Sequence, residues 1–91
     1  MIVVNSPHNP SGKIFNNEEL TIIEELLKKY PRVIVVEDNV YETFVYDGFD
    51  YGSVHKLSQR ESVKDRCLSL YTAGKLLKAT GIRVGWILGE K

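Results

Sequence analysis

The chain has 91 residues and a formal net charge of zero, with 12 basic and 12 acidic side chains. This balance argues against a nucleic-acid partner, because nucleic-acid-binding domains usually carry a basic excess. No apolar run approaches the roughly 20 residues of a membrane-spanning helix, so no membrane partner is expected either. The single cysteine, Cys67, excludes an internal disulfide and fits a reducing compartment. Because it lies in the apolar run CLSLY, we expect a buried structural thiol.

The first half of the chain predicts a strand, a helix and a second strand. The apolar run IVVN at 2–5 is typical of a strand buried on both faces, and the turn formers SPHNPSGK at 6–13 exclude regular structure. Either Asn16 or Asn17 can cap the following helix. Its apolar stripe comprises Leu20, Ile23, Leu26, Leu27 and Tyr30. With the apolar run VIVVED at 33–38, this order predicts a right-handed strand–helix–strand unit on a parallel sheet.

The second half contains two further strand candidates separated by irregular segments. Residues 39–48 predict a short helical or irregular segment, and the polar stretch 49–65 predicts a surface path with a short helix. CLSLYT at 67–72 is a third strand candidate, and GIRVGWIL at 81–88 is a fourth that contains two glycines. Three aromatic side chains are expected to be packing residues, with contact to a substrate as the alternative: Tyr46, Phe49 and Tyr51.

Polar side chains collect where the predicted strands end. In open α/β sheets, ligands bind at the carboxyl ends of the strands. An amide, carboxylates, a phenol, a hydroxyl, a lysine and an arginine would meet at this edge. They are Asn9, Glu37, Asp38, Tyr41, Thr72, Lys75 and Arg83.

This set of groups matches the requirements of one cofactor, pyridoxal 5'-phosphate. The cofactor needs a lysine amine for a Schiff base and a carboxylate facing its ring nitrogen. Its phenolic oxygen needs hydrogen-bond donors, and its phosphate needs an arginine and hydroxyl groups. Strand alternation puts Glu37 and Asp38 on opposite faces of the sheet, so at most one of them faces the cofactor. Alternation alone does not choose between them. No cluster of histidine and cysteine suggests a metal site.

A rival interpretation starts from the run VVEDN at the end of the second strand. It resembles the acidic pocket of a phosphorylation receiver domain. In that fold, however, the acidic pair lies on the first strand and the phosphoacceptor on a later one. Here a complete strand–helix unit precedes the acidic pair, and the later strand CLSLYT does not end in an aspartate. The order of the elements therefore favours the cofactor site.

Three segments carry a resemblance to a known family. NSPHNPSGKIF, DNVYETFVYDG and AGKLLKATGIRVGW, in this order and at these distances, resemble the class I/II aminotransferases of the fold-type I pyridoxal-phosphate superfamily. The chain is most similar to the kynurenine (glutamine) aminotransferase group, whose members often also act as cysteine-conjugate β-lyases. The resemblance implies an α/β fold that is part of a three-layer α/β/α large domain. Its sheet would be mostly parallel, with an antiparallel last strand at 83–88, and residues 1–91 would be a fragment of that cofactor-binding domain.

The resemblance also implies roles for individual side chains. Lys75 would be catalytic and would hold the cofactor as an internal aldimine, while Asp38 would pair with the pyridine nitrogen. Tyr41 and Asn9 would hydrogen-bond the phenolic oxygen. The peptide bond between Asn9 and Pro10 is often cis in this family.

The phosphate would be held by Arg83 and Thr72. Thr72 stands where serine is usual in the family but keeps a hydroxyl group. Residues 76–78 replace the more common threonine, aromatic and serine residues, and Ile82 replaces a frequent tryptophan. No reacting group is lost, so these differences concern substrate preference and phosphate affinity.

The implied reaction is transamination between an amino acid, of kynurenine, glutamine or aromatic type, and a 2-oxo acid. A homodimer is expected, in the cytoplasm or alternatively in the mitochondrion. The isolated 91 residues are expected to bind cofactor poorly and to be inactive, because the family's phosphate-binding turn, ring-stacking aromatic and carboxylate-binding arginine are missing. Two alternatives stay open: a β-lyase or synthase that uses the same Lys75 and Asp38, and a non-catalytic module of a transcription regulator.

Overall fold

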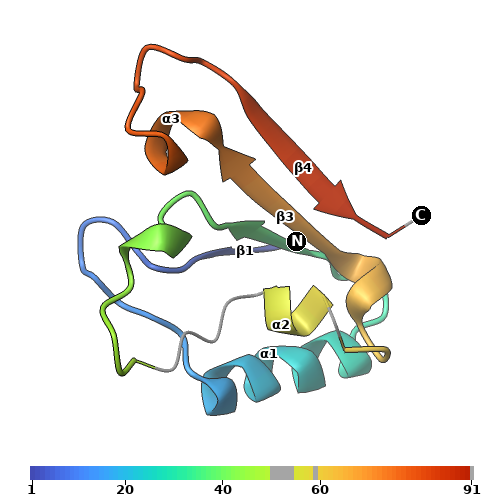
Figure 1. Cartoon of the computed structure of the whole chain (residues 1–91). Coiled ribbons are helices and arrows are strands. Elements are labelled where there is room, and N and C mark those ends of the chain that lie inside the picture. Colours follow the sequence, from blue (N-terminus) through green and yellow to red (C-terminus); the bar gives the residue numbers. More distant parts are fainter. Residues whose placement is uncertain (50–54, 59, 91) are drawn as a thin grey trace.

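A computed structural model describes residues 1–49, 55–58 and 60–90, without the side chains of residues 55 and 56. The described strands form one mixed sheet in the order β1–β2–β3–β4 (Figure 1). Their bounds are β1 Ile2–Asn5, β2 Val35–Asp38, β3 Cys67–Thr72 and β4 Gly85–Gly89. Strand β2 pairs in parallel with both β1 and β3, whereas β4 is antiparallel to β3. The prediction of a mostly parallel sheet with an antiparallel last strand is confirmed.

The described helices are short, apart from one. Helix α1 links β1 to β2 and lies with α2 on one face of the sheet, whereas α3 follows directly on the end of β3 (Figure 1). The helix bounds are α1 Asn17–Lys29, α2 His55–Ser58 and α3 Ala73–Leu76, and those of the 3₁₀ turns are η1 Glu42–Phe44 and η2 Lys64–Arg66. These residues supply the sheet and one helical layer, and the third layer implied by the resemblance stays a prediction.

Helix α1 begins with a complete capping box. The side chain of Asn16 accepts a hydrogen bond from the backbone N–H of Glu19, and the carboxylate of Glu19 accepts one from the backbone N–H of Asn16. This exchange satisfies two backbone donors that a helix start otherwise leaves unpaired. The structure thus selects Asn16, rather than Asn17, as the cap.

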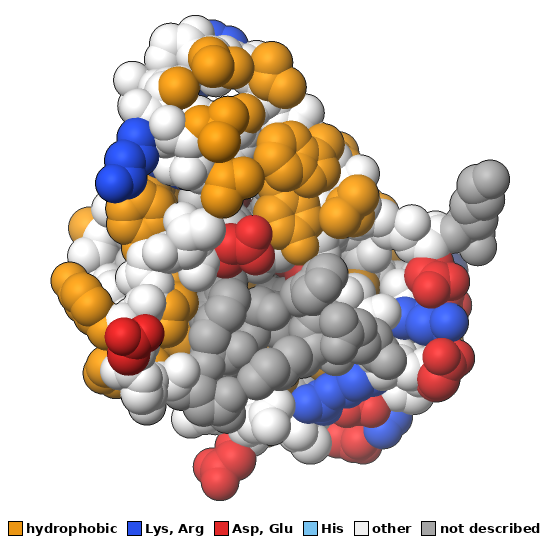
Figure 2. All heavy atoms as spheres, viewed as in Figure 1, with side chains coloured by type: hydrophobic (Ala, Val, Ile, Leu, Met, Phe, Trp, Pro, Cys, Tyr) orange, Lys and Arg blue, Asp and Glu red, His pale blue; other side chains and the backbone are white. Residues whose placement is uncertain are grey.

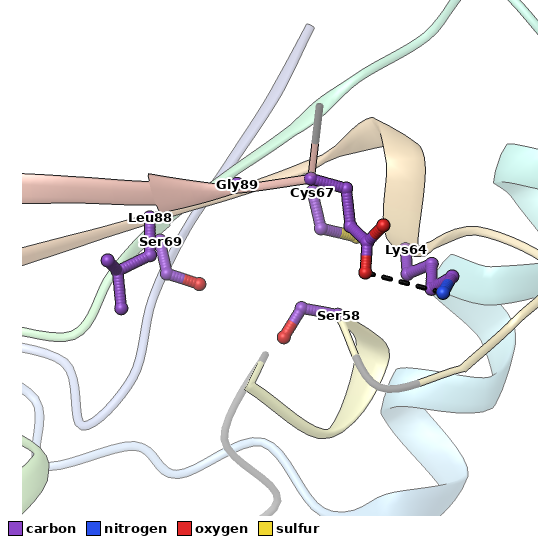
Figure 3. A pocket seen from close by; sticks show the side chains of 7 residues that line it. Ser58, Lys64, Cys67, Ser69, Leu88 and Gly89 are labelled. Carbon is purple, nitrogen blue, oxygen red and sulfur yellow. Dashed lines mark ion pairs between the residues drawn. The ribbon is translucent and has the colours of Figure 1, made fainter.

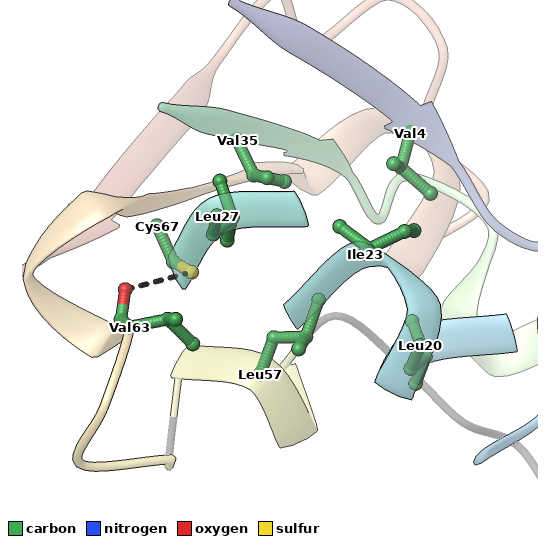
Figure 4. Close-up of a cluster of buried hydrophobic side chains, with 8 residues drawn as sticks. All are labelled: Val4, Leu20, Ile23, Leu27, Val35, Leu57, Val63 and Cys67. Atoms are coloured by element: carbon green, nitrogen blue, oxygen red, sulfur yellow. Dashed lines mark hydrogen bonds between the residues drawn. The ribbon is translucent and has the colours of Figure 1, made fainter. Parts of the chain in front are cut away.

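One side of α1 closes the hydrophobic core. Leu20, Ile23 and Leu27 face the sheet and are buried, as the stripe predicts (Figure 4). The other members of the core are Val4, Val35, Leu57, Val63 and Cys67. The prediction was wrong for Leu26 and Tyr30, which are 41% and 50% exposed. Because α1 packs against a single layer, only the side chains at the centre of its apolar face are buried, and those at the sides of that face stay exposed.

Cys67 lies inside this core and matches its predicted structural role. Its side chain is buried, and its thiol donates a hydrogen bond to the carbonyl oxygen of Val63 (Figure 4). Burial raises the pKa of the Cys67 thiol to about 11. A thiol that stays protonated at neutral pH is a poor nucleophile, so Cys67 serves packing.

The sheet face opposite α1 is largely exposed in the described part of the chain. Val3 on β1 and Ile87 on β4 are 61% and 63% exposed. The prediction that 2–5 is buried on both faces was therefore wrong here, because α1 and α2 cover one face only. Figure 2 shows hydrophobic side chains gathered around the end of the molecule formed by β4 and α3.

None of the described helices is long and apolar enough to cross a membrane.

The packing of α1 gives a direct test with two neighbouring leucines. Leu27 is fully buried, so Leu27→Ala should lower the free energy of unfolding by about 2–5 kcal/mol through lost contacts and a residual cavity. Leu26→Ala removes the same atoms from an exposed position and should cost about 0.5 kcal/mol. Urea unfolding of both variants measures the difference, and equal losses would contradict this orientation of α1.

Candidate active site

The turn after β1 is held closed by its own backbone. His8 N–H donates to Lys13 O at 2.9 Å, and Gly12 N–H donates to His8 O at 2.8 Å. Gly12 has a φ of +72°, a conformation that suits glycine. The Asn9–Pro10 peptide bond is cis, as the resemblance led us to expect, and the Ser6–Pro7 bond is cis as well. This turn presents the side chain of Asn9 at the carboxyl edge of the sheet.

The side chain of Asn5 ties this turn to the end of β2. Its Nδ2 donates to the backbone carbonyl of Asp38 at 2.9 Å, and its Oδ1 accepts from Asn9 N–H at 3.2 Å. Asn5 and Asp38 are also register partners in the parallel pair. The predicted site residues Asn9 and Asp38 are therefore connected through a single amide, which sequence reasoning did not identify.

The strand β2 points its two acidic side chains to opposite faces. Glu37 lies on the α1 side and is fully buried, whereas Asp38 is partly exposed. Asp38 is the register partner of Leu70, which places Asp38 and Thr72 on the same sheet face. Asp38 Oδ1 accepts a long hydrogen bond of 3.4 Å from Val40 N–H.

Tyr41 stands between the turn after β1 and helix α3. Asn9 Nδ2 donates to the Tyr41 hydroxyl oxygen at 3.0 Å. The Nζ of Lys75 lies 5.4 Å from the centre of the Tyr41 ring, within range of a cation–π contact. Three of the predicted residues are thus brought together by contacts between their own side chains.

Lys75 is placed by the junction of β3, α3 and β4. Thr72 caps α3, since its Oγ1 accepts from Gly74 N–H at 3.3 Å and donates to Val84 O at 3.3 Å. Gly74 is buried, and a Cβ built on it would meet the carbonyl oxygen of Ile82 at 3.4 Å. The small residues before Lys75 therefore allow the chain that leads to β4 to approach the start of α3 closely.

Two cavities adjoin at Lys75. The larger, of about 650 Å³, is lined by Asn9, Tyr41 and Lys75 together with apolar and aromatic side chains. The smaller, of about 330 Å³, is lined by Thr72, Lys75 and Arg83 and by neighbouring residues. Asp38 lines neither cavity. The structure therefore groups four of the other five predicted site residues around Lys75 and leaves Asp38 at the strand end beside them.

The smaller cavity suits an anion. Within the described residues Arg83 forms no salt bridge, and its Nη1 donates to Thr80 O at 3.3 Å. Thr72 supplies a hydroxyl group in the same cavity. An arginine without a carboxylate partner beside a hydroxyl can bind a phosphate dianion. The residues present therefore fit pyridoxal 5'-phosphate, with the amine of Lys75 between the phosphate side and the Asn9–Tyr41 side.

Aromatic side chains surround the larger cavity. Tyr46 and Phe49 are 83% and 66% exposed, so the prediction that they are packing residues was wrong, and the third predicted packing residue, Tyr51, lies outside the described residues. Tyr46, Phe49 and Phe44 line the cavity that contains Lys75. The sequence signal for this role was their position just after Tyr41, at the edge of the sheet where the other site residues collect.

A third cavity, of about 440 Å³, lies on the same side of the sheet as α1, between α2, η2 and the strands β3 and β4 (Figure 3). Ser69 and Cys67 line it, and none of the predicted site residues does. At its edge Lys64 is paired with the carboxylates of Glu61 and Glu90. This cavity is therefore separate from the site around Lys75.

Comparisons with known proteins identify the family of this chain. The family model for aminotransferase class I and II matches residues 1–91. Human kynurenine–oxoglutarate transaminase 1 is 40% identical over 88 residues, which are 97% of this chain and 20% of that protein. The kynurenine–oxoglutarate transaminase of Dictyostelium discoideum is 36% identical over 90 residues, with 98% of this chain and 20% of that protein covered. This chain spans about a fifth of the length of these relatives.

A solved structure shows the same arrangement of elements. The aspartate aminotransferase from Rhizobium meliloti superposes with a TM-score of 0.84 at 33% sequence identity. The match covers 96% of this chain and 21% of that chain. The described sheet is therefore a known part of a larger fold.

The close pairing of β3 with β4 provides a test of how Lys75 is positioned. A Cβ at Gly85 would lie 2.7 Å from the backbone oxygen of Tyr71, too close without movement of β3. Gly85→Ala should therefore lower the free energy of unfolding by about 1–3 kcal/mol. Gly81→Ala is the matched control, because a Cβ built on Gly81 would meet no atom of the described residues within 4 Å and the change should cause no loss. Thermal unfolding that shows equal stability of both variants would contradict the described β3–β4 pairing.

Proposed function

This chain belongs to the family of class I and II aminotransferases, and we propose that it carries part of the cofactor site of a transaminase. The enzyme would transfer the amino group of an amino acid to a 2-oxo acid with pyridoxal 5'-phosphate. The observation that carries the proposal is the position of Lys75, which lines both a cavity with Asn9 and Tyr41 and a cavity with Thr72 and Arg83.

Lys75 would both hold the cofactor and move the proton. When bound, pyridoxal 5'-phosphate supplies an electron sink for the carbanion that remains after the substrate loses its α-proton. The amine of Lys75 would attach the cofactor until substrate displaces it. Its Nζ would then take the α-proton from the substrate and return it to a carbon of the cofactor, as a general base and acid in turn.

Tyr41 and Asn9 would orient the cofactor ring through its phenolic oxygen. Asn9 Nδ2 already donates to the Tyr41 oxygen at 3.0 Å. The hydroxyl proton of Tyr41 is therefore available for a different acceptor. A tyrosine held in this way can donate toward the larger cavity without losing its support, which favours a single orientation of the bound ring.

Arg83 and Thr72 would bind the phosphate group. Arg83 supplies positive charge and a planar set of donors. The Thr72 hydroxyl now donates to Val84 O and would turn its proton toward a phosphate oxygen, while its oxygen lone pairs continue to cap α3. Binding of the phosphate would thus be linked to the start of the helix that carries Lys75.

Asp38 would keep the proton on the pyridine nitrogen. The support for this role is its position at the carboxyl end of β2, on the sheet face that it shares with Thr72. A carboxylate at this point would stabilise the positive charge of the protonated ring nitrogen, and it is this protonated ring that would accept the electrons. Glu37, on the other face, would take no part in this contact.

The remaining features of the proposal concern the whole protein. The named relatives are kynurenine–oxoglutarate transaminases, which supports a substrate of kynurenine, glutamine or aromatic type together with a 2-oxo acid. The aromatic side chains around the larger cavity are suited to such a substrate. Residues 1–91 would form part of the cofactor-binding large domain of a homodimer, in the cytoplasm or alternatively in the mitochondrion.

A trapping experiment tests the role of Lys75. Borohydride reduction of the whole protein in the presence of pyridoxal 5'-phosphate should label the peptide that contains Lys75, as measured by mass spectrometry. Lys75→Arg keeps the positive charge but cannot form the Schiff base, so the label should disappear. Where transamination is measurable, this variant should be slower by about 10²–10⁴-fold, because the general base is lost.

Lys78→Arg is the matched control for this experiment. Lys78 is an exposed lysine three residues further on and lines neither cavity at the site. Its replacement should leave the labelling of Lys75 unchanged. Labelling that survives Lys75→Arg, or that is lost with Lys78→Arg, would refute the assignment of the cofactor to Lys75.

A further inference from the structure

Glu37 is a buried carboxyl group that the proposed reaction does not use. It is fully buried at the end of β2, on the sheet face covered by α1. Its Oε2 accepts hydrogen bonds from Ser69 Oγ at 2.5 Å and from Asn39 Nδ2 at 3.1 Å. Its other oxygen, Oε1, is buried and has no hydrogen-bond partner among the described residues. A buried charge with an unpaired oxygen is costly, so this arrangement calls for a different protonation state.

A second unpaired atom lies on the side chain that Glu37 already contacts. Asn39 Oδ1 is also buried, and the described part of the chain offers it no hydrogen-bond partner. Asn39 and Glu37 side chains point to the same sheet face, two residues apart. Both orphaned atoms are acceptors, so each of them lacks a donor.

We propose that Glu37 is a neutral carboxylic acid in a two-point pair with the carboxamide of Asn39, and that this pair fixes the turn that positions Tyr41. In the pair Glu37 Oε1–H donates to Asn39 Oδ1, while Asn39 Nδ2–H donates to Glu37 Oε2. A carboxylic acid and a carboxamide are complementary in this way, because each offers one donor and one acceptor side by side. Ser69 then supports the same Oε2 from β3.

Among the described residues, only the hydrogen bonds from Ser69 and Asn39 favour the ionised form of Glu37. In the described part of the chain no salt bridge includes Glu37, and α1 packs on this face with the apolar side chains of Leu20, Ile23 and Leu27. Strand β3 contributes Cys67, whose pKa is raised to about 11, and Tyr71, whose pKa is also raised by burial. Burial raises the pKa of Glu37 to about 7, against the opposing effect of its hydrogen bonds from Ser69 and Asn39.

The backbone of Asn39 explains why the pair matters for the site. Asn39 N–H donates to Leu70 O at 3.1 Å, and Asn39 O accepts from Glu42 N–H at 3.1 Å. Asn39 is therefore the first residue of the turn that carries Tyr41 to Asn9 and Lys75. Loss of the proton from Glu37 would leave two acceptors facing each other and would loosen this turn. The effect on the cofactor rests on the proposed function, whereas the pair itself does not.

The pH dependence of unfolding tests the pair without any cofactor. A carboxyl group whose pKa is raised on folding stabilises the fold below its unfolded pKa and loses that contribution as the pH rises through the folded value. For Glu37 this window runs from 4.5 to about 7. Relative to Glu37→Gln, the folded-to-unfolded ratio of the unmodified protein should fall by about two orders of magnitude across it.

Glu37→Gln is the informative variant because glutamine can form the same two-point pair with Asn39 at every pH. It should fold and be at least as stable as the unmodified protein at pH 8. Subtracting its curve removes other titrations, such as that of Glu24, whose pKa is lowered to about 2 chiefly by the Ser62 hydroxyl. Glu61→Gln, the same change at a highly exposed carboxylate, should leave the slope unchanged. A difference that does not vary with pH, or a failure of Glu37→Gln to fold, would overturn the proposal.

Infrared spectroscopy tests the proton and its partner separately. At pH 5.5 the unmodified protein should show the carbonyl band of a buried, hydrogen-bonded carboxylic acid, and Glu37→Gln should lack it. Asn39→Ala should move this band to a higher frequency, because the Glu37 carbonyl oxygen loses the hydrogen bond from Asn39 Nδ2. A band that stays in place in Asn39→Ala would overturn the pairing.

Binding of pyridoxal 5'-phosphate then tests the link to the site. Above pH 7 the affinity of the unmodified protein should fall relative to that of Glu37→Gln, and the two should be equal near pH 5.5. Equal affinity at both pH values would overturn the link to Tyr41. If Lys75 instead fails to be labelled in either protein, the proposed function fails while the unfolding and infrared results still decide the pair.

Discussion

The parallel pairing of β1, β2 and β3 is the constraint on which the rest of the structure depends. It brings the carboxyl ends of three strands to one edge, so that side chains far apart along the chain become neighbours. The contact of Asn9 with Tyr41 and the position of Lys75 near the Tyr41 ring both exist because these strand ends coincide. The antiparallel strand β4 then returns the chain past Thr72, which brings Arg83 to the same lysine.

The hydrogen bonds at this edge connect the strands as well as the site residues. Asn5 joins the turn after β1 to the end of β2, and Asn39 joins the end of β2 to β3. Thr72 performs a similar role between β3, α3 and the start of β4. The site is thus built on backbone positions that are fixed by the side chains of Asn5 and Thr72 and by the backbone of Asn39, which restricts where Tyr41 and Lys75 can move.

Much of this arrangement is predictable from the sequence, because it depends on local pattern. A cap at Asn16 or Asn17, the buried positions Leu20, Ile23 and Leu27 of α1 and the antiparallel last strand were expected from residue types, spacing or the family resemblance. The exposure of Leu26, Val3 and Phe49 was not predictable. The periodicity of apolar residues shows which side chains share a face of a helix or strand. Whether that face is buried depends on which other segments pack against it, and the periodicity does not give their positions.

The two acidic residues of β2 illustrate the same limit. Alternation assigns Glu37 and Asp38 to opposite faces but cannot say which face is buried. The structure decides this through the core beneath Glu37, and the partners of its carboxyl group come from Asn39 and from a different strand, at Ser69. Such a network has no sequence signature, because it depends on the register between β2 and β3.

The most direct test of the account is a crystal structure of the protein with pyridoxal 5'-phosphate bound. The account predicts continuous electron density between Lys75 Nζ and the cofactor, with the Asp38 carboxylate within hydrogen-bond distance of the ring nitrogen and the phosphate against Arg83. A cofactor attached to another lysine, or one whose ring nitrogen lies across the sheet from Asp38, would contradict it.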